Sequence, residues 1–234
     1  MLSNNNKKDK LVKEVFNNVF DKYDLMNDIL SLGVHRLWKK KLINWLSPKK
    51  NTILLDMASG TGDIVKLYLE YLKNHGTVYA VDPNAKMLEV AKIKLNKFRN
   101  IKWYLSSAEK LNFKDNYFDY YTISFGLRNT HNINYSLQEA HRVLKPGGRF
   151  MCLEFSRIKN YKIKKLYDIY SKNIPKIGNF IIGDEQPYEY LIKSIKNFYN
   201  QEELIDLMKK NNFYKCEYRN LSGGIVAIHS GWKI

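Results

Sequence analysis

The chain has 234 residues, 44% of them hydrophobic, and a formal net charge of +16, so it is long enough for one α/β domain with a sizeable core and a cap. Its longest apolar runs are far shorter than a membrane span, and Met1 to Lys10 is polar, so neither a transmembrane helix nor a secretory signal is expected. Only two cysteines are present, Cys152 and Cys216, which excludes a disulfide framework and indicates a reducing compartment. The positive charge is explained equally well by binding to nucleic acid or a membrane and by the amino-acid bias of AT-rich coding.

Two amphipathic helices are predicted before the first strand. Residues 11–23 place apolar side chains at a spacing of 3.6 residues, and residues 34–46 do the same, with Leu37, Trp38, Leu42, Trp45 and Leu46 expected to face inward. Together they would form an N-terminal helical cap over residues 11–46.

Strands and helices then alternate, which is typical of a parallel sheet. Strands are predicted at 53–56, 77–81, 101–105, 118–124 and 149–155, and helices at 62–73, 84–97 and about 132–143, with a short helix before residue 118. The turn Lys145-Pro146-Gly147-Gly148 is predicted to end the helix before it, because Pro blocks continuation and Gly permits reversal.

The last third of the chain departs from this alternation. Residues 157–200 predict two or three basic, Tyr-rich helical segments, followed by a helix at 201–211. Strands are predicted at 213–220 and 224–232, and Ser222-Gly223-Gly224 between them is a hairpin signal. We therefore expect one domain over residues 1–234, with a core at 50–156, a helical substrate cap at 157–200 and a C-terminal helix and hairpin at 201–234.

Residues 53–63 combine a buried strand, a turn of small residues and the start of a helix. Gly60 and Gly62 let the backbone approach a ligand closely, because glycine has no Cβ and tolerates positive φ. Twenty residues after Gly62, the second strand ends in Asp82, where an acid suits hydrogen bonds to ribose hydroxyls. These features predict an adenosine-containing cofactor on a doubly wound α/β sheet.

The spacing of this turn distinguishes between cofactors. A dinucleotide site needs a third glycine, and that position holds Val65. Asp56, Ala58, Gly60 and Gly62 instead resemble the D-x-A-x-G-x-G motif of class I S-adenosylmethionine (SAM) methyltransferases, whose cofactor has no pyrophosphate. The alternative interpretation is a glycine turn that only packs a helix on the sheet. The presence of Asp56 before the turn and Asp82 after it favours the cofactor site over this alternative. The terminal antiparallel pair also resembles the class I arrangement: a Rossmann-like, mostly parallel sheet of seven strands.

Several longer segments carry a narrower resemblance. They are YDLMND at residues 23–28, SLGVHRLWK at 31–39, SFGLRN at 124–129, RVLKPGGR at 142–149 and LEFS at 153–156. Together they resemble the UbiE-type family, the C-methyltransferases of ubiquinone and menaquinone biosynthesis, from about Val12 to the C-terminus. One departure is Ala58-Ser59, where the family often has Ala-Gly or Gly-Gly; Ser is small enough that we expect no loss of binding.

The resemblance implies roles for individual residues around SAM. Thr61 would meet the methionine part and Asp82 both ribose hydroxyls. Ser107 and Ala108 match the pair that frames the adenine, and Ser124 matches a further cofactor contact. The expected cofactor set is completed by three residues of the glycine motif, Asp56, Gly60 and Gly62.

The implied reaction is methyl transfer from SAM to a ring carbon of a polyprenylated quinol: demethylmenaquinol to menaquinol, 2-polyprenyl-6-methoxy-1,4-benzoquinol to its 3-methyl derivative, or both. Ring carbon is a weak nucleophile, so the site needs alignment, stabilisation of a phenolate and a base. We expect Arg128 to stabilise the phenolate, beside Asn129, with Tyr23 contributing from the N-terminal cap. The five histidines lack metal-ligand spacing, and no metal is expected.

Two other functions remain open at this level. A nucleic-acid methyltransferase fits the charge, but the segment after the fourth strand lacks an Asn-Pro-Pro-aromatic motif, and no Pro-Cys nucleophile is present. A SAM-binding assembly protein without catalysis is the other alternative. Labelled methyl from SAM, followed into lipid, tRNA or neither, separates the three.

The expected partner is a lipid quinol rather than nucleic acid, which implies peripheral association with a membrane or with a quinone-biosynthesis complex. The expected location is the cytoplasmic face of the inner membrane, or the matrix side in a mitochondrion, and a homodimer is left open. The segment 159–196 interleaves lysines with Tyr, Ile, Leu and Phe, the mixture of an interfacial amphipathic element. An ordinary cap with a solvated basic face is the alternative.

Overall fold

The computed structural model describes residues 28, 31, 33–182 and 185–234. Its elements, in chain order, are α3 (His35–Leu46), β1 (Thr52–Met57), α4 (Asp63–Tyr71), β2 (Gly76–Asp82), α5 (Ala85–Lys94), β3 (Ile101–Leu105), β4 (Phe118–Ser124), the 3-10 turn η1 (Leu127–Asn129), α6 (Ile133–Val143), β5 (Leu144–Phe155), α7 (Tyr161–Ile182), α8 (Gln186–Lys196), α9 (Gln201–Lys210), β6 (Tyr214–Leu221), η2 (Ser222–Gly224) and β7 (Val226–Trp232). The predicted helix at 11–23 lies outside the described residues.

Seven strands form one sheet in the order β3-β2-β1-β4-β5-β7-β6. The pairs among β1 to β5 are parallel, whereas β7 runs antiparallel to β5 and to β6. This confirms the predicted doubly wound sheet with a C-terminal antiparallel hairpin. The strand order reverses between β1 and β4, and ligands of such sheets bind at the carboxyl ends of the strands at that point.

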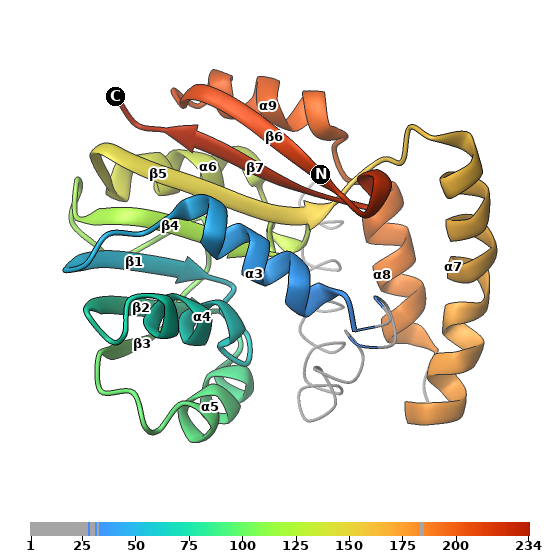
Figure 1. The fold of residues 1–234 in the computed structure, drawn as a ribbon, viewed down its shortest axis with the longest axis horizontal. Helices are drawn as coiled ribbons and strands as arrows, with labels where there is room; N and C mark the ends of the chain where they lie inside the picture. Colours follow the sequence, from blue (N-terminus) through green and yellow to red (C-terminus); the bar gives the residue numbers. More distant parts are fainter. Residues whose placement is uncertain (1–27, 29–30, 32, 183–184) are drawn as a thin grey trace.

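The sheet is covered on both faces, because successive side chains of its buried strands point to opposite sides. Leu54 of β1 belongs to a core cluster with residues of α3 and α4, whereas its neighbour Leu55 packs in a second cluster with residues of α6 and α9. Figure 1 shows α3 and α4 in front of the sheet and α6 behind it. Both clusters are rich in fully buried Leu, Ile, Val and Tyr side chains, so the strand ends that carry the site stand on a packed support.

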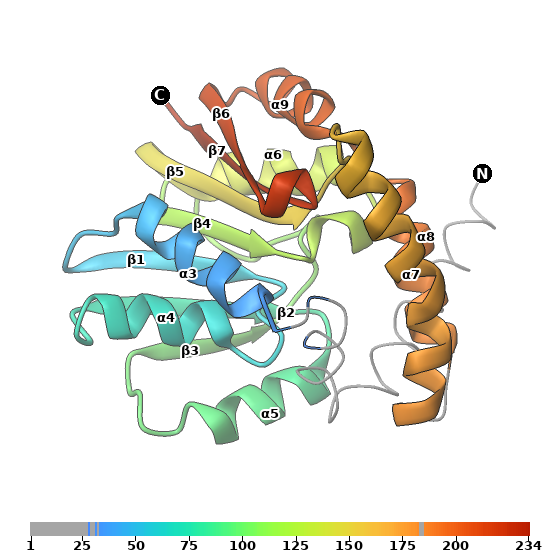
Figure 2. The same ribbon diagram turned by 45° about the vertical axis from the view of Figure 1, so that its right-hand side comes forward.

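Helices α7 and α8 form a separate layer beyond the carboxyl ends of the central strands. They lie side by side in both views (Figures 1 and 2). These are the helical segments predicted for residues 157–200. Of the described helices, none is long and apolar enough to cross a membrane.

Three local predictions are wrong. Leu37 is 59% exposed, because the buried face of α3 passes through His35, Trp38, Lys39 and Leu42 instead. No helix lies between β3 and β4: Arg142 donates to the carbonyl oxygens of Leu111 (2.8 Å) and Phe113 (2.7 Å), and so holds this loop in irregular form.

The third concerns the segment Lys145 to Gly148. Helix α6 does end at Val143, where the sequence predicted its end, but the segment that follows belongs to β5 instead of forming a separate turn. Leu144 pairs with Phe118 and Arg149 with Tyr120, so the register shifts between them. Gly147 adopts φ +80° within this irregularity, and its N–H donates to the carbonyl of Lys233 (2.7 Å). The glycines thus shape a bulge at the start of a strand rather than a helix end.

Candidate active site

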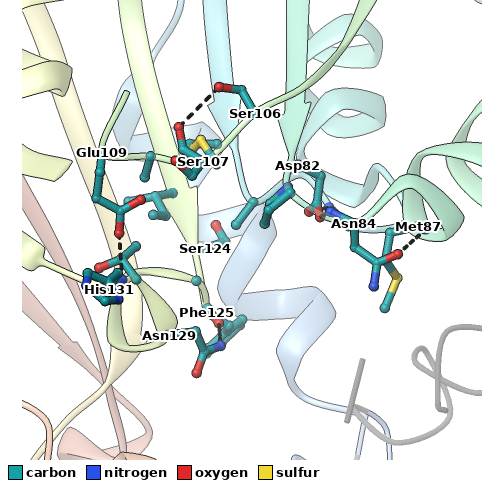
Figure 3. A pocket seen from close by; sticks show the side chains of 18 of the residues that line it. Asp82, Asn84, Met87, Ser106, Ser107, Glu109, Ser124, Phe125, Asn129 and His131 are labelled. Atoms are coloured by element: carbon teal, nitrogen blue, oxygen red, sulfur yellow. Dashed lines mark hydrogen bonds between the residues drawn. The ribbon is translucent and has the colours of Figure 1, made fainter. Parts of the chain in front are cut away.

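A cavity of about 660 Å³ opens at the carboxyl ends of β1, β2 and β4. Its walls come from the turn after β1, the start of the loop after β2, the loop after β3, and the segment from the end of β4 to α6. Figure 3 shows Asp82 and Asn84 on one side of this pocket and Glu109 and His131 on the opposite side, with Ser124 between them. The pocket therefore lies where the strand order reverses, as expected for this class of sheet.

The glycine turn forms one wall and leads into α4. Gly60 has φ +51° and Gly62, the residue before α4, has φ +86°, a region that glycine adopts without strain. A Cβ on Gly62 would lie 2.5 Å from Cδ1 of Leu95. The turn thus needs glycine at Gly62 both for its conformation and for its packing.

Asp82 fixes this turn to the end of β2. Its Oδ2 accepts from the N–H of Gly60 (2.9 Å) and its Oδ1 from the N–H of Asn84 (2.8 Å). Burial raises the pKa of Asp82 to about 6, although the two N–H groups favour the ionised form. Each carboxylate oxygen keeps a second lone pair, so Asp82 is able to accept from two ligand hydroxyls while holding the turn.

Ser107, Ala108 and Ser124 also line the pocket. The Oγ atom of Ser124 is buried and has no hydrogen-bond partner within the described part of the chain. Glu109 accepts from the N–H groups of His131 (2.6 Å) and Asn132 (3.2 Å), which ties the loop after β3 to the start of α6. Glu109 and His131 line the pocket but were missed from the sequence, where neither stands in a recognisable motif.

A small hollow adjoins the turn on the side of α3. Asp56, at its base, accepts from Oγ1 of Thr122 (2.7 Å), and burial raises its pKa to about 7. Asp63, the first residue of α4, accepts from Nζ of Lys39 (2.8 Å) and of Lys94 (2.9 Å). Burial opposes ionisation of Asp63, but the two lysines outweigh it and lower the pKa. Lys39, inside the HRLWK segment, was not predicted as a site residue.

The SFGLRN segment closes the pocket and carries Arg128. Nη1 of Arg128 donates to Glu154 Oε1 (2.6 Å) and to the carbonyl oxygen of Phe125 (2.7 Å). Its guanidinium lies 5.5 Å from the centroid of the Phe155 ring. The residue is only 8% exposed and is not among those lining the pocket.

The next residue, Asn129, does line the pocket. Its Nδ2 donates to the carbonyl oxygen of Phe125 (3.4 Å), and its Oδ1 accepts from the hydroxyl of Tyr190 on α8 (3.0 Å). Asn129 therefore joins the cap to the pocket wall.

The structure brings most of the predicted site residues together. Those lining the main pocket are Gly60, Asp82, Ser107, Ala108, Ser124 and Asn129. Asp56 and Thr61 lie in the adjoining hollow, Gly62 begins α4 beside it, and Arg128 lies behind the wall. Tyr23 lies outside the described residues. Those that are described contain no group of His, Cys, Asp and Glu side chains able to hold a metal ion.

A seven-stranded sheet of this order, with a glycine turn after β1 and an acid at the end of β2, defines a class I SAM-dependent methyltransferase. A SAM-dependent methyltransferase from Thermotoga maritima superposes with a TM-score of 0.67 at 22% identity, covering 95% of this chain and 99% of that one. One from Aquifex aeolicus has a TM-score of 0.64 at 16% identity, covering 89% and 97%. These likenesses support the fold.

The chain belongs to the ubiE/COQ5 methyltransferase family, whose model matches residues 3–233. It is 50% identical over 236 residues to a ubiquinone/menaquinone biosynthesis C-methyltransferase UbiE of Rickettsia bellii, covering 98% of this chain and 95% of the relative. The protein of that name from Rickettsia prowazekii is 49% identical over 235 residues, covering 97% and 94%. The chain is thus an enzyme, a SAM-dependent C-methyltransferase, as the sequence motifs predicted.

The residues at the pocket fit this cofactor. Asp82 has lone pairs for two hydroxyls, and the Oγ of Ser124 is buried without a partner among the described residues. The small side chains of Ser107 and Ala108 leave room for a planar ring.

Proposed function

We propose that this protein methylates a ring carbon of a polyprenylated quinol in respiratory quinone biosynthesis. The acceptor is demethylmenaquinol, the corresponding methoxybenzoquinol, or both. The observation that carries the proposal is one pocket with Asp82 on one wall and Asn129 on another, in a chain about half identical to proteins named for this reaction.

In this proposal the cofactor lies across the ends of β1, β2 and β4. Asp82 accepts from the ribose hydroxyls, Ser107 and Ala108 frame the adenine, and Thr61 contacts the methionine part. Ser124 gives its unpartnered hydroxyl to the cofactor. SAM supplies an electrophilic methyl group on a sulfonium; the protein holds that group in line with the ring carbon and excludes water.

The acceptor ring would lie against Asn129 and Phe125. Loss of a proton from a quinol hydroxyl moves electron density to the ortho carbon, so a donor beside that oxygen lowers the barrier. Within the SFGLRN segment, Asn129 lines the pocket and has a side chain that carries N–H groups. We therefore assign it the contact with the ring oxygen.

Arg128 acts from behind this wall. Its buried guanidinium is already engaged by Glu154 and by the carbonyl of Phe125. It places positive charge near the developing phenolate and fixes the backbone that carries Asn129. Tyr23 remains a proposed contributor from the N-terminal segment.

The tail of the acceptor places the substrate in a bilayer, and α7 offers a surface for it. Lys162, Leu166 and Ile169 are exposed and share one side of this helix, since they are spaced by four and three residues. Tyr161, Lys165 and Lys172 are exposed as well. We propose that these six residues, the α7 surface, contact an anionic membrane. Two other tyrosines of this helix, Tyr167 and Tyr170, are only partly exposed and are not included in this surface.

The test is transfer of labelled methyl from SAM by purified protein. Demethylmenaquinol, the methoxybenzoquinol and unmodified tRNA are offered separately, with the Asp82→Asn variant as a control that removes the carboxylate. The proposal expects label in one or both quinols, and much less with the variant. Label in tRNA, or in no acceptor while S-adenosylhomocysteine still binds, contradicts it.

A further inference from the structure

The orientation of the Asn129 amide is set by two groups on opposite sides. Its Oδ1 accepts from Tyr190 (3.0 Å), and its Nδ2 faces the carbonyl oxygen of Phe125 (3.4 Å). If the amide turned over, Oδ1 would face that carbonyl and two acceptors would oppose each other. The second N–H of Nδ2 is then available to a ligand in the pocket that Asn129 lines.

The carbonyl of Phe125 is itself held from behind. It accepts from Nη1 of Arg128 (2.7 Å), which also donates to Glu154 (2.6 Å) at the end of β5. Phe125 has φ +55°, a conformation that turns the chain at this point. The backbone side of Asn129 is therefore fixed by the sheet, and the other side depends on α8.

Tyr190 is well suited to be a fixed donor. It stands on α8, half-buried, next to Leu191, whose side chain is buried. Burial raises the pKa of the Tyr190 hydroxyl, so it remains protonated through the neutral range. A protonated hydroxyl that donates to Oδ1 leaves that oxygen less able to turn toward a ligand.

We propose that Tyr190 is a positioning residue: from the cap, it holds the Asn129 amide so that Nδ2 donates to the oxygen of the acceptor ring. The inference rests on the proposed function, because the acceptor oxygen is that of a quinol. It adds that activation of the ring depends on α8 being seated against SFGLRN. The hydrogen bonds of Asp82, on another wall of the same pocket, are made to Gly60 and Asn84 and involve no residue of α8.

The variant is Tyr190→Phe, which removes one hydroxyl and keeps the ring. Tyr188→Phe is the matched control: it lies on the same helix, and its buried hydroxyl has no partner within the described residues. For Tyr190→Phe we expect kcat for quinol methylation to fall roughly tenfold, less than the 10²–10³ typical of a direct oxyanion donor. Affinity for S-adenosylhomocysteine should stay within about twofold.

Two further readouts separate positioning from general damage. The acid limb of the kcat–pH profile should move to higher pH in Tyr190→Phe, because the bound quinol ionises less readily. In a double-mutant cycle, Tyr190→Phe should cost nothing further in an Asn129→Ala background. Independent, multiplicative losses with an unmoved pH profile would overturn the proposal.

A last measurement does not depend on the acceptor. The side-chain amide signal of Asn129 is identified in nitrogen-15 NMR by its loss in Asn129→Asp. We expect Tyr190→Phe to shift this signal and Tyr188→Phe to leave it in place. If wild-type protein methylates no quinol but the signal shifts, the proposed function fails and the positioning contact stands. An unshifted signal overturns the positioning contact, whatever the wild-type activity.

Discussion

Arg128 and Glu154 form a buried ion pair in which Nη1 of the arginine lies 2.6 Å from Oε1 of the carboxylate, with side chains 5% and 0% exposed. Burial raises the pKa of Glu154, against the effect of Arg128. The same arginine nitrogen holds the carbonyl of Phe125. The pair therefore couples the end of β5 to the segment that closes the pocket.

Removing one partner of this pair should be costly. Arg128→Ala leaves a buried carboxylate without its cation, and we expect the free energy of unfolding to fall by about 3–5 kcal/mol. Denaturant unfolding followed by circular dichroism measures the change. The exposed pair Lys164–Asp168 provides the control, since Lys164→Ala should change stability little. Equal effects of the two substitutions would contradict a structural role for the buried pair.

Arg128→Lys separates charge from geometry. A lysine restores a cation beside Glu154, but a single ammonium does not reproduce the planar fork that reaches Glu154 and Phe125 together. We expect most of the stability to return, S-adenosylhomocysteine to bind, and quinol turnover to stay at least tenfold below wild type. Calorimetry and the methyl-transfer assay on the same preparation test this. Wild-type turnover in the lysine variant would show that charge alone suffices.

Asp82 should make cofactor affinity depend on pH. Its pKa is about 6 in the free protein because it is buried, and ribose hydroxyls bind best to the ionised form. Affinity for S-adenosylhomocysteine should thus be level above about pH 7 and fall by up to about tenfold per pH unit below 6. Titration calorimetry from pH 5 to 8 measures it.

The Asp82→Asn variant is the control for this effect. It should bind more weakly at pH 7, since the loss of charged hydrogen bonds to two hydroxyls costs roughly 1.5–3 kcal/mol each before water compensates. The part of the pH dependence due to Asp82 should disappear. Asp56, with a pKa of about 7, remains in the adjoining hollow and accounts for any residual slope. An unchanged pH profile in the variant would remove Asp82 from the cofactor site.

The α7 surface should bind anionic vesicles. Each lysine near such a bilayer adds about 1 kcal/mol at most, and salt weakens the attraction. Charge reversal at Lys162, Lys165 and Lys172 should reduce cosedimentation at low salt and lower turnover of long-tailed quinol more than that of a short-tailed analogue. Lys164 is left intact because it pairs with Asp168 (2.9 Å).

Reversal of Lys209, Lys210 and Lys215 is the matched control, since these lysines are also exposed but lie at the end of α9 and in β6. It removes the same charge from another part of the protein. Equal losses in the two triple variants would show that net charge, and not the α7 surface, drives binding.

The sequence predicted the sheet because its signals there are local. The predicted strands 101–105 and 118–124 agree with β3 and β4 to the residue. Short runs flanked by turn residues leave little choice for where a strand begins and ends. The proposed cofactor residues Gly60, Asp82 and Ser124 lie at one pocket, because the ends of parallel strands meet at one edge of the sheet.

The sequence did not predict the contacts between residues that are far apart along the chain. The pairing of Arg128 with Glu154 joins positions 26 residues apart, and that of Tyr190 with Asn129 joins positions 61 apart. The loop between β3 and β4 looked helical, but Arg142 takes the carbonyls that a helix would use. Helix propensity within a segment does not predict hydrogen bonds to that segment from a side chain on another element.

The quinones of the source cell test the central claim most directly. Lipid mass spectrometry is applied to cells lacking this protein and to the same cells carrying the wild-type chain or Asp82→Asn. The account predicts that a demethyl-quinone accumulates without the protein, that the methylated quinone returns with the wild-type chain, and that Asp82→Asn restores little of it. A normal quinone profile in cells lacking the protein would contradict the assigned reaction.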